Sequence, residues 1–263
     1  FKGPEGRNFH HEGRAIYSNS DDLVILSGCT FCGSGIEEGF FNHIFIRQDV
    51  FSAPPTQVII ENCSFHYNQL GNRWVDYLVT LVDCQVDLRG CEFTRNGNQC
   101  LYFSSTSANI SDCFFYNNTY PDHIHRNELG GVIYSCSESD LCIDNCTLIN
   151  NQGFHNSTAV SNSEDSIMSI SNCLFGGNFS TGGDVLEDYP SACIINLGDL
   201  NVTSCQFNDN RVHCYRYPPD QSAAVLNLRA GNSSFNNNLF YRNRASHHGG
   251  VARINSGNHT FSN

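Results

Sequence analysis

The chain has 263 residues, 40% of them hydrophobic, which is enough to bury a core in one elongated domain. Its formal net charge is −12 and Lys2 is its only lysine, which argues against nucleic acid and against an anionic membrane as partners. No apolar run is long enough to span a bilayer. We expect residues 1–263 to form a single domain that is a fragment or a repeating unit of a longer assembly.

One short pattern recurs along the whole chain, about every 22 to 34 residues: an apolar residue, two spacers, Cys, any residue, Phe, two further residues and Asn. Residues 60–68 (IENCSFHYN) show it in full. A fixed motif at this period indicates a solenoid, in which each repeat buries its apolar face against its neighbours. We expect the Phe slots to form an interior ladder made of Phe31, Phe65, Phe93, Phe115, Leu148, Phe175, Phe207 and Phe240.

The spacing within the repeat predicts which solenoid forms. The residue before each Cys slot is Gly, Asn, Asp or Ser, types that tolerate the left-handed backbone region, so a sharp corner is expected there. Alternating apolar residues on both sides of the corner predict two short strands, and a third apolar run lies upstream in every repeat. The sequence therefore predicts an all-β fold, a right-handed parallel β-helix of about nine coils with three short strands per coil. At about 4.8 Å per coil, this rod would be about 43 Å long.

Fourteen cysteines are many for a reduced cytosolic protein of this size, and they favour an oxidised, extracellular compartment. Two copies of the repeat place a cysteine nine residues after the Cys slot, which predicts the bridges Cys91–Cys100 and Cys205–Cys214. Cys136–Cys142 is a further candidate. Bridges between Cys slots of adjacent coils, or a column of reduced thiols in those slots, remain as alternatives.

Asn-x-Ser/Thr sequons are moderately enriched over chance, and several lie at predicted corners or loops where a glycan could be carried. The alternative is that Asn, Ser and Thr are there as turn residues. The nine candidate N-glycosylation sites are Asn62, Asn109, Asn117, Asn145, Asn156, Asn178, Asn201, Asn232 and Asn258.

The segments between each Asn slot and the next coil vary most in length and should leave the rod along one edge. They carry Trp74 and many tyrosines, so this edge is the predicted contact surface for glycans or surface proteins, unless these aromatic residues fold back over the rod. His123 and His125, with Asp122 and Glu128, form the best metal-like cluster, but no second group stands at a zinc spacing. We therefore expect neither a metal nor a cofactor.

Polysaccharide-cleaving enzymes also use parallel β-helices, so an enzymatic function is an alternative for this fold. Glycoside hydrolysis needs two carboxylates about 5 to 9.5 Å apart. Here the acidic residues, such as Glu138, Asp140 and Asp184, are scattered and do not recur at matching positions of neighbouring coils. No catalytic residue is expected, and a polysaccharide lyase, hydrolase or glycan-binding module is kept as the alternative function.

Two short motifs carry a resemblance to a known family. FxxN recurs from Phe65–Asn68 to Phe240–Asn243, and GGV occurs at residues 130–132 and 249–251. They resemble the FxxN and GGA[I/L/V] repeats of the polymorphic outer membrane protein family. That resemblance implies a β-helical surface domain used in adhesion, although GGV replaces GGA here.

These observations together predict an extracellular structural glycoprotein, a rod that forms part of a surface filament, stalk or adhesin. Neither end of the sequence shows an amphipathic segment that could cover the last coil. The expected partners are therefore further coils of the same chain or other copies stacked head to tail.

Overall fold

The computed structural model describes residues 16–19, 23–33, 44–48, 54–68, 77–97, 99–119, 131–154, 157–182, 191–214, 225–246 and 249–263. These residues form thirty β-strands, and none of them is helical. All strand pairs between the named strands are parallel, and the strands gather in four sheets, called A to D below. The chain is thus a parallel β-helix, as the repeat predicts.

Sheets A and B each contain one strand from every coil. Sheet A consists of β1 (Ile16–Ser18), β4 (Ile44–Arg47), β7 (Tyr77–Val82), β10 (Gln99–Ser104), β13 (Ile133–Cys136), β17 (Val160–Asn162), β21 (Ile194–Asn196), β25 (Leu226–Leu228) and β29 (Ala252–Ile254). Sheet B consists of β2 (Val24–Ser27), β5 (Thr56–Glu61), β8 (Cys84–Arg89), β11 (Ser107–Ser111), β14 (Asp140–Asp144), β18 (Ile167–Ser171), β22 (Asp199–Thr203), β26 (Asn232–Asn236) and β30 (Asn258–Ser262).

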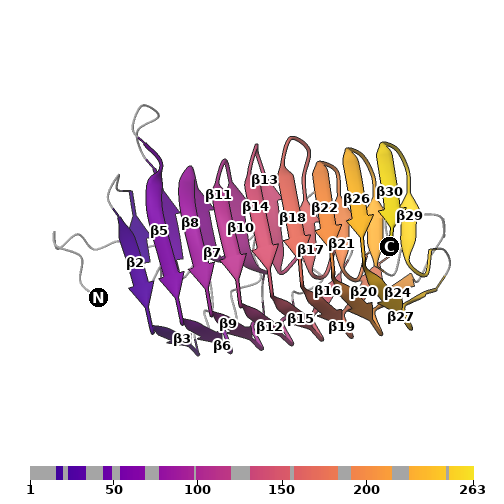
Figure 1. Ribbon diagram of the computed structural model, residues 1–263. Coiled ribbons are helices and arrows are strands. Elements are labelled where there is room, and N and C mark those ends of the chain that lie inside the picture. Colours follow the sequence, from indigo (N-terminus) through magenta and orange to yellow (C-terminus); the bar gives the residue numbers. More distant parts are fainter. Residues whose placement is uncertain are drawn as a thin grey trace.

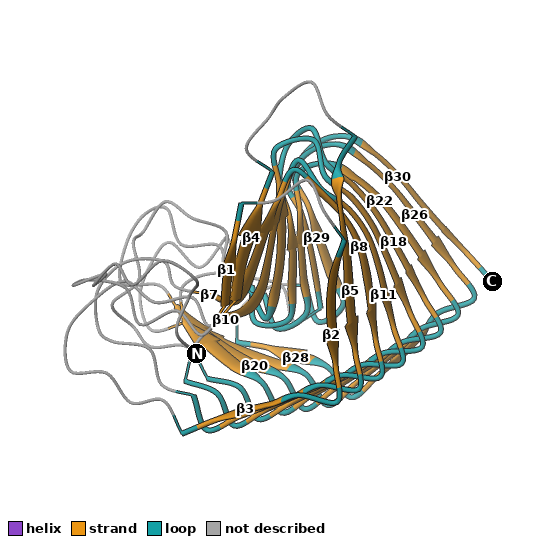
Figure 2. Cartoon of the chain, turned by 90° about the vertical axis from the view of Figure 1, so that its left-hand side faces the viewer, coloured by secondary structure: helices purple, strands orange, loops and turns teal. Residues whose placement is uncertain are grey.

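Sheet C follows sheet B in eight coils, and sheet D follows sheet C in four. Sheet C consists of β3 (Thr30–Cys32), β6 (Ser64–His66), β9 (Glu92–Thr94), β12 (Phe114–Tyr116), β15 (Thr147–Ile149), β19 (Leu174–Gly176), β23 (Gln206–Asn208) and β27 (Leu239–Tyr241). Sheet D consists of β16 (Gln152–Phe154), β20 (Phe179–Gly182), β24 (Arg211–Cys214) and β28 (Arg244–Ala245). Figure 1 shows the coils stacked in chain order from β2 to β30, and Figure 2 looks along the stack from the end that carries β1.

The fourth sheet is a difference from the expected three strands per coil. Its strands begin directly after the Asn slot, where the backbone N–H of Gln152 donates to the carbonyl of Asn118 one coil earlier at 2.8 Å. Phe179 and Arg211 repeat this bond to Asn151 and Asn178. The ladder therefore continues past the Asn slot in these coils.

The corner before each Cys slot has the left-handed backbone that the sequence predicts. All eight corner residues have φ between 51° and 61°: Gly28, Asn62, Gly90, Asp112, Asn145, Asn172, Ser204 and Asn237. The corner turns sheet B into sheet C, and the Cys and Phe slots then enter the interior. Substituents at Gly90 are also restricted because an added Cβ would lie 2.7 Å from Oδ1 of Asn62 in the preceding coil.

The Phe slots stack inside the rod in two runs. Phe31, Phe65, Phe93 and Phe115 lie over one another with ring centroids 4.6 to 4.9 Å apart and interplanar angles of 8° or less. Phe175, Phe207 and Phe240 form a second run at 4.7 and 5.0 Å. Leu148 pairs in register with Phe115 and Phe175 and fills the gap between the two runs.

The Asn slots form a buried amide ladder. Each amide oxygen accepts two bonds from the preceding coil, from the backbone N–H and the side-chain NH₂ of its Asn. For Asn118, Nδ2 donates to Oδ1 of Asn151 at 3.0 Å and to the carbonyl of Phe93 at 2.8 Å. The ladder runs from Asn68 to Asn243. These bonds compensate the loss of water around a row of buried amides.

We predict that Asn118→Ala destabilises the rod by about 2 to 4 kcal/mol, because it leaves the N–H of Asn96 and the carbonyl of Phe93 without these buried partners. Chemical denaturation measures the free energy of unfolding. The matched control is Asn109→Ala on the exposed face of β11, which should stay within about 0.5 kcal/mol of the parent. Equal losses in the two variants would contradict a special role for the ladder.

Candidate functional site

The most unusual chemical feature is a continuous column of thiols, which we call the thiol column. It lies inside the corner between sheets B and C, and adjacent members are one coil apart. The residue following each Cys donates its backbone N–H to the carbonyl of the Cys one coil earlier, at 2.8 to 2.9 Å, so the stacking is in register. Asn238 occupies the same position in the eighth coil. The thiol column consists of Cys29, Cys63, Cys91, Cys113, Cys146, Cys173 and Cys205.

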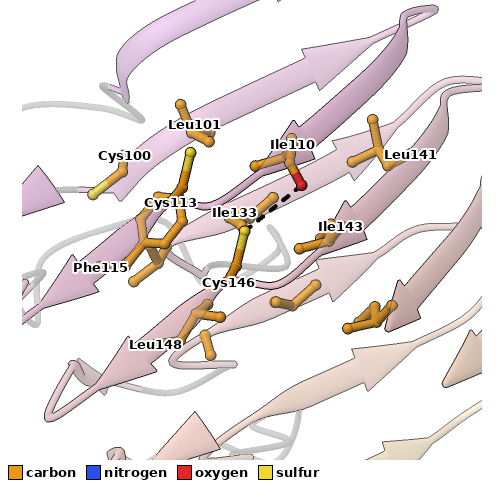
Figure 3. Close-up of a cluster of buried hydrophobic side chains, with 14 of the residues drawn as sticks. Cys100, Leu101, Ile110, Cys113, Phe115, Ile133, Leu141, Ile143, Cys146 and Leu148 are labelled. Carbon is orange, nitrogen blue, oxygen red and sulfur yellow. Dashed lines mark hydrogen bonds between the residues drawn. The ribbon is translucent and has the colours of Figure 1, made fainter. Parts of the chain in front are cut away.

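From Cys63 to Cys205, every sulfur in the thiol column lies near two backbone carbonyl oxygens, one of its own coil and one of the preceding coil. The Sγ of Cys146 lies 3.2 Å from the carbonyl oxygen of Asp144 and 3.6 Å from that of Ile110 in the preceding coil, as Figure 3 shows for the second contact. Backbone N–H groups also point at sulfur, since Cys146 donates to Sγ of Cys173 at 3.4 Å. These thiols can therefore donate to a carbonyl, and those of Cys173 and Cys205 also accept from a backbone amide.

Burial and contact between neighbours control the ionisation of these thiols. Desolvation raises the pKa of Cys63 to about 11. Further along, hydrogen bonds from the two flanking thiols lower the pKa of Cys146, and the same contacts raise the pKa of Cys113 and Cys173. The sulfurs thus interact along the column as one set.

A second polar column lines the corner between sheets A and B and was not expected from the sequence. The backbone N–H of Cys84 donates to Oγ1 of Thr106 at 3.4 Å, and that of Thr106 donates to Oγ of Ser139 at 3.2 Å. Burial raises the pKa of the Cys84 thiol to about 12. The available signal was a small polar residue two positions after two strands of sheet A, Cys84 after β7 and Thr106 after β10.

The predicted disulfides within the described residues are not formed. None of Cys91, Cys100, Cys136 and Cys142 forms a disulfide. Cys91 lies in the thiol column whereas Cys100 belongs to sheet A, and Figure 3 shows Cys100 on a different strand from the column cysteine Cys113. Cys136 packs against Tyr102, but Cys142 faces outward from sheet B, so their side chains point apart. The side chain of Cys214, the expected partner of Cys205, lies outside the described residues.

The sequons divide by burial. Asn178 is fully buried in the amide ladder and donates to Leu148 and Asn210, so it has no room for a glycan and its prediction is wrong for the folded chain. Asn156 lies outside the described residues. The exposed sequon residues are Asn62, Asn109, Asn117, Asn145, Asn201, Asn232 and Asn258.

Several acidic groups of the described residues lie on the outward face of sheet B. Asp140 and Asp144 flank the exposed Cys142 on β14, and Glu61 pairs with Arg89 at 2.7 Å. Hydrogen bonds from Ser171 and Asn172 lower the pKa of Asp144. A carboxylate held ionised by such donors lacks the raised pKa of a general acid.

Most of the predicted contact edge lies outside the described residues. Trp74 and the cluster of Asp122, His123, His125 and Glu128 lie outside the described residues. Within the described ranges, no group of three or more His, Cys, Asp or Glu side chains is arranged to hold a metal ion. The same ranges contain no helix capable of crossing a membrane.

Comparison with protein families, with curated proteins and with solved structures finds no match to this chain.

We predict that Cys32 and Cys142 are alkylated fastest among the described cysteines at pH 8, because they are the exposed ones. Desolvation and the charges of Asp144 and Asp140 raise the pKa of Cys142, so its rate should rise with pH. Asp140→Asn should increase its rate about two- to threefold at pH 8. Mass spectrometry after timed iodoacetamide treatment measures both rates. Cys32 serves as the internal control, and fast labelling of Cys63 in the folded chain would contradict the burial.

A second prediction concerns Asn178. When the chain passes through a eukaryotic secretory pathway, folded secreted material should carry no glycan there, because the amide is needed in the ladder. Glycopeptide mapping compares it with Asn201, which is exposed one coil later. A glycan on Asn178 in protein that retains its β-sheet circular dichroism would contradict the structure.

Proposed function

We propose that this chain is a structural rod of an extracellular surface, a part of a filament, stalk or adhesin. The observation that carries the proposal is the unbroken in-register stacking of coils, since sheets A and B each join nine parallel strands in chain order. Among the described residues, large apolar side chains are exposed mainly in the outermost coils. Eight of the ten exposed large hydrophobic residues lie in the first coil or in the last strands of the sheets. The eight are Tyr17, Leu23, Ile25, Leu239, Tyr241, Val251, Ile254 and Phe261.

Some of these residues continue the interior columns of the rod. Ile254 pairs in register with the buried Leu228 yet is 52% exposed, and Phe261 stacks on the buried Phe235 at 4.7 Å yet is 47% exposed. The strands that hold them, β29 and β30, have one paired edge and one open edge. An open edge with an apolar interior is a template for another parallel strand, so further coils or a second copy would fit there.

The stacking also suits a mechanical role. Backbone hydrogen bonds between coils run along the rod, and the Phe stack and the amide ladder repeat the same contacts inside it. A load along the axis is therefore shared by many equivalent bonds at each level. Sheets A and B extend through all nine coils without a break in strand order, which supports one continuous unit.

The extracellular location is part of the proposal. Exposed sequons such as Asn62 and Asn201 support it, because glycans there would project from the surface. The cysteines do not add support, since none of the thirteen that the structure describes forms a disulfide. The FxxN repeats, which resemble those of the polymorphic outer membrane protein family, agree with a surface protein and with adhesion as one of its forms.

Filament formation is tested by replacing interior residues at the open end. Ile254→Lys and Phe261→Lys place a charge where the next coil would pack, and each should reduce assembly more than tenfold. Electron microscopy and light scattering of the purified chain measure fibres. Ile167→Lys is the matched control, because Ile167 is 53% exposed on the outward face of a central coil and should not affect assembly.

The outcomes separate the alternatives. Continuous fibres with a repeat of about 4.8 Å that the two end variants abolish would support a filament subunit. If the parent chain forms discrete rods at every concentration, a filament is contradicted, and a stalk or an adhesin is then the function that the proposal retains. Release of sugar fragments from a polysaccharide by such rods would favour the enzyme alternative and overturn a purely structural role.

A further inference from the structure

We propose that the thiol column is a binding site for soft monovalent metal ions such as Cu(I), each bridging the sulfurs of two successive coils. This inference does not depend on the mechanical role proposed above. It rests on the position, spacing and surroundings of the seven sulfurs from Cys29 to Cys205.

The spacing of the thiol column suits a bridging metal better than a disulfide. Successive coils lie about 4.8 Å apart, so an ion midway between two stacked sulfurs would be about 2.4 Å from each. A metal–thiolate bond has nearly this length, about 2.3 Å for zinc. A disulfide would instead require the sulfurs to approach to about 2.05 Å and the Cβ atoms to about 3.8 Å. The in-register backbone bonds on either side of Cys146 oppose such a contraction.

The thiol column offers two sulfur ligands to each metal ion. Each sulfur has one neighbour above and one below, whereas zinc and similar ions need three or four ligands around one point. The described residues contain no such group of three. Cu(I) and Ag(I) are soft, prefer thiolates and form linear complexes with two of them. The arrangement therefore selects monovalent d¹⁰ ions.

The charges can balance inside the rod. When the first ion enters, two S–H bonds break, two metal–sulfur bonds form, and two protons leave to solvent without any transfer of electrons. As the column fills, thiolates and ions alternate, so seven thiolates and six ions leave one net negative charge. This alternation avoids the large cost of an isolated buried charge.

The polar groups around the sulfurs suit both the bound metal ion and the thiolates. Carbonyl oxygens of Ser111 and Leu88 lie 3.2 and 3.8 Å from Sγ of Cys113, and their negative ends face the column where a cation would lie. Backbone N–H groups of Cys146 and Cys173 point at the next sulfur at 3.4 Å, which stabilises a thiolate. These groups are already in place without the metal.

The column has one accessible end. Cys29 is half-buried in the first coil, whereas Cys63 and Cys91 are fully buried. At the other end, Asn238 donates its Nδ2–H to the carbonyl of Val202 and accepts the backbone N–H of Cys205 at 2.8 Å, which closes the row with a group that is not a soft ligand. Ions would therefore load from Cys29.

The test is an anaerobic titration of the reduced protein with Cu(I) supplied as its bicinchoninate complex, with bound ions counted by native mass spectrometry. Seven sulfurs have six gaps, so the column should take six ions. Cys146→Ser leaves groups of four and two thiols, with three gaps and one gap, and should bind two ions fewer than the parent. Cys205→Ser removes only the last gap and should bind one fewer. X-ray absorption should show two sulfur neighbours per copper.

The control is Cys193→Ala, which removes a fully buried cysteine outside the thiol column and should leave the ion count unchanged. Circular dichroism checks that each variant keeps its sheets, and Cys205→Ser maintains the test if Cys146→Ser fails to fold. Equal ion counts in the parent and in folded Cys205→Ser would overturn the proposal. So would a mass loss of two per cysteine pair without bound metal, because the column would then form disulfides.

Discussion

In-register stacking of coils is the constraint on which every other feature of this protein depends. Each residue of one coil must pair with its equivalent in the next, so a position that is interior in one coil is interior in all. A buried polar side chain is then tolerated only if its copies hydrogen-bond to one another. The Asn slots meet this condition, since each amide oxygen accepts two bonds from the preceding coil. The polar interior is therefore a set of columns, each satisfied along the rod axis.

Register survives large changes in coil length because the changes fall in the connections into and out of sheet A; one residue lies between β7 and β8, for example, but eight lie between β4 and β5. Thirty-five residues separate the partners Ile44 and Val79, but only twenty-two separate Val79 and Leu101. Between sheets B and C the spacing never varies: Glu92 lies four positions after Leu88, and Thr147 lies four positions after Ile143. Variation thus accumulates on both sides of sheet A, where added residues do not displace the corner between sheets B and C or the thiol column. This separation lets one fold carry connections of different composition.

The sequence predicts the features that the repeat itself encodes. The corner at Asn62 and the stack at Phe65 follow from residue type and spacing, and both have the expected geometry. A second left-handed corner, directly before each Asn slot, was missed. Asn117, Asn150 and Asp209 suit it, but Tyr67 and Arg95 occupy it in two coils, and the stacking of coils overrides their own backbone preference. The repeat pattern also did not predict whether the side chain of each sequon asparagine points into the rod or into solvent. The sequons at Asn178 and Asn201 look alike in sequence, but one amide points into the ladder and the other into solvent.

The eighth Cys slot shows what the thiol column does and does not require. Asn238 makes the same two contacts as a column cysteine, one to a carbonyl of the preceding coil and one from a backbone N–H. Its contacts are shorter, 2.8 and 2.9 Å, than the 3.4 and 3.8 Å of Cys205 in the slot before. Hydrogen bonding would therefore be served at least as well by an amide in every coil. Seven successive sulfurs instead of amides are explained if the column uses the property that only sulfur brings, its affinity for soft metal ions.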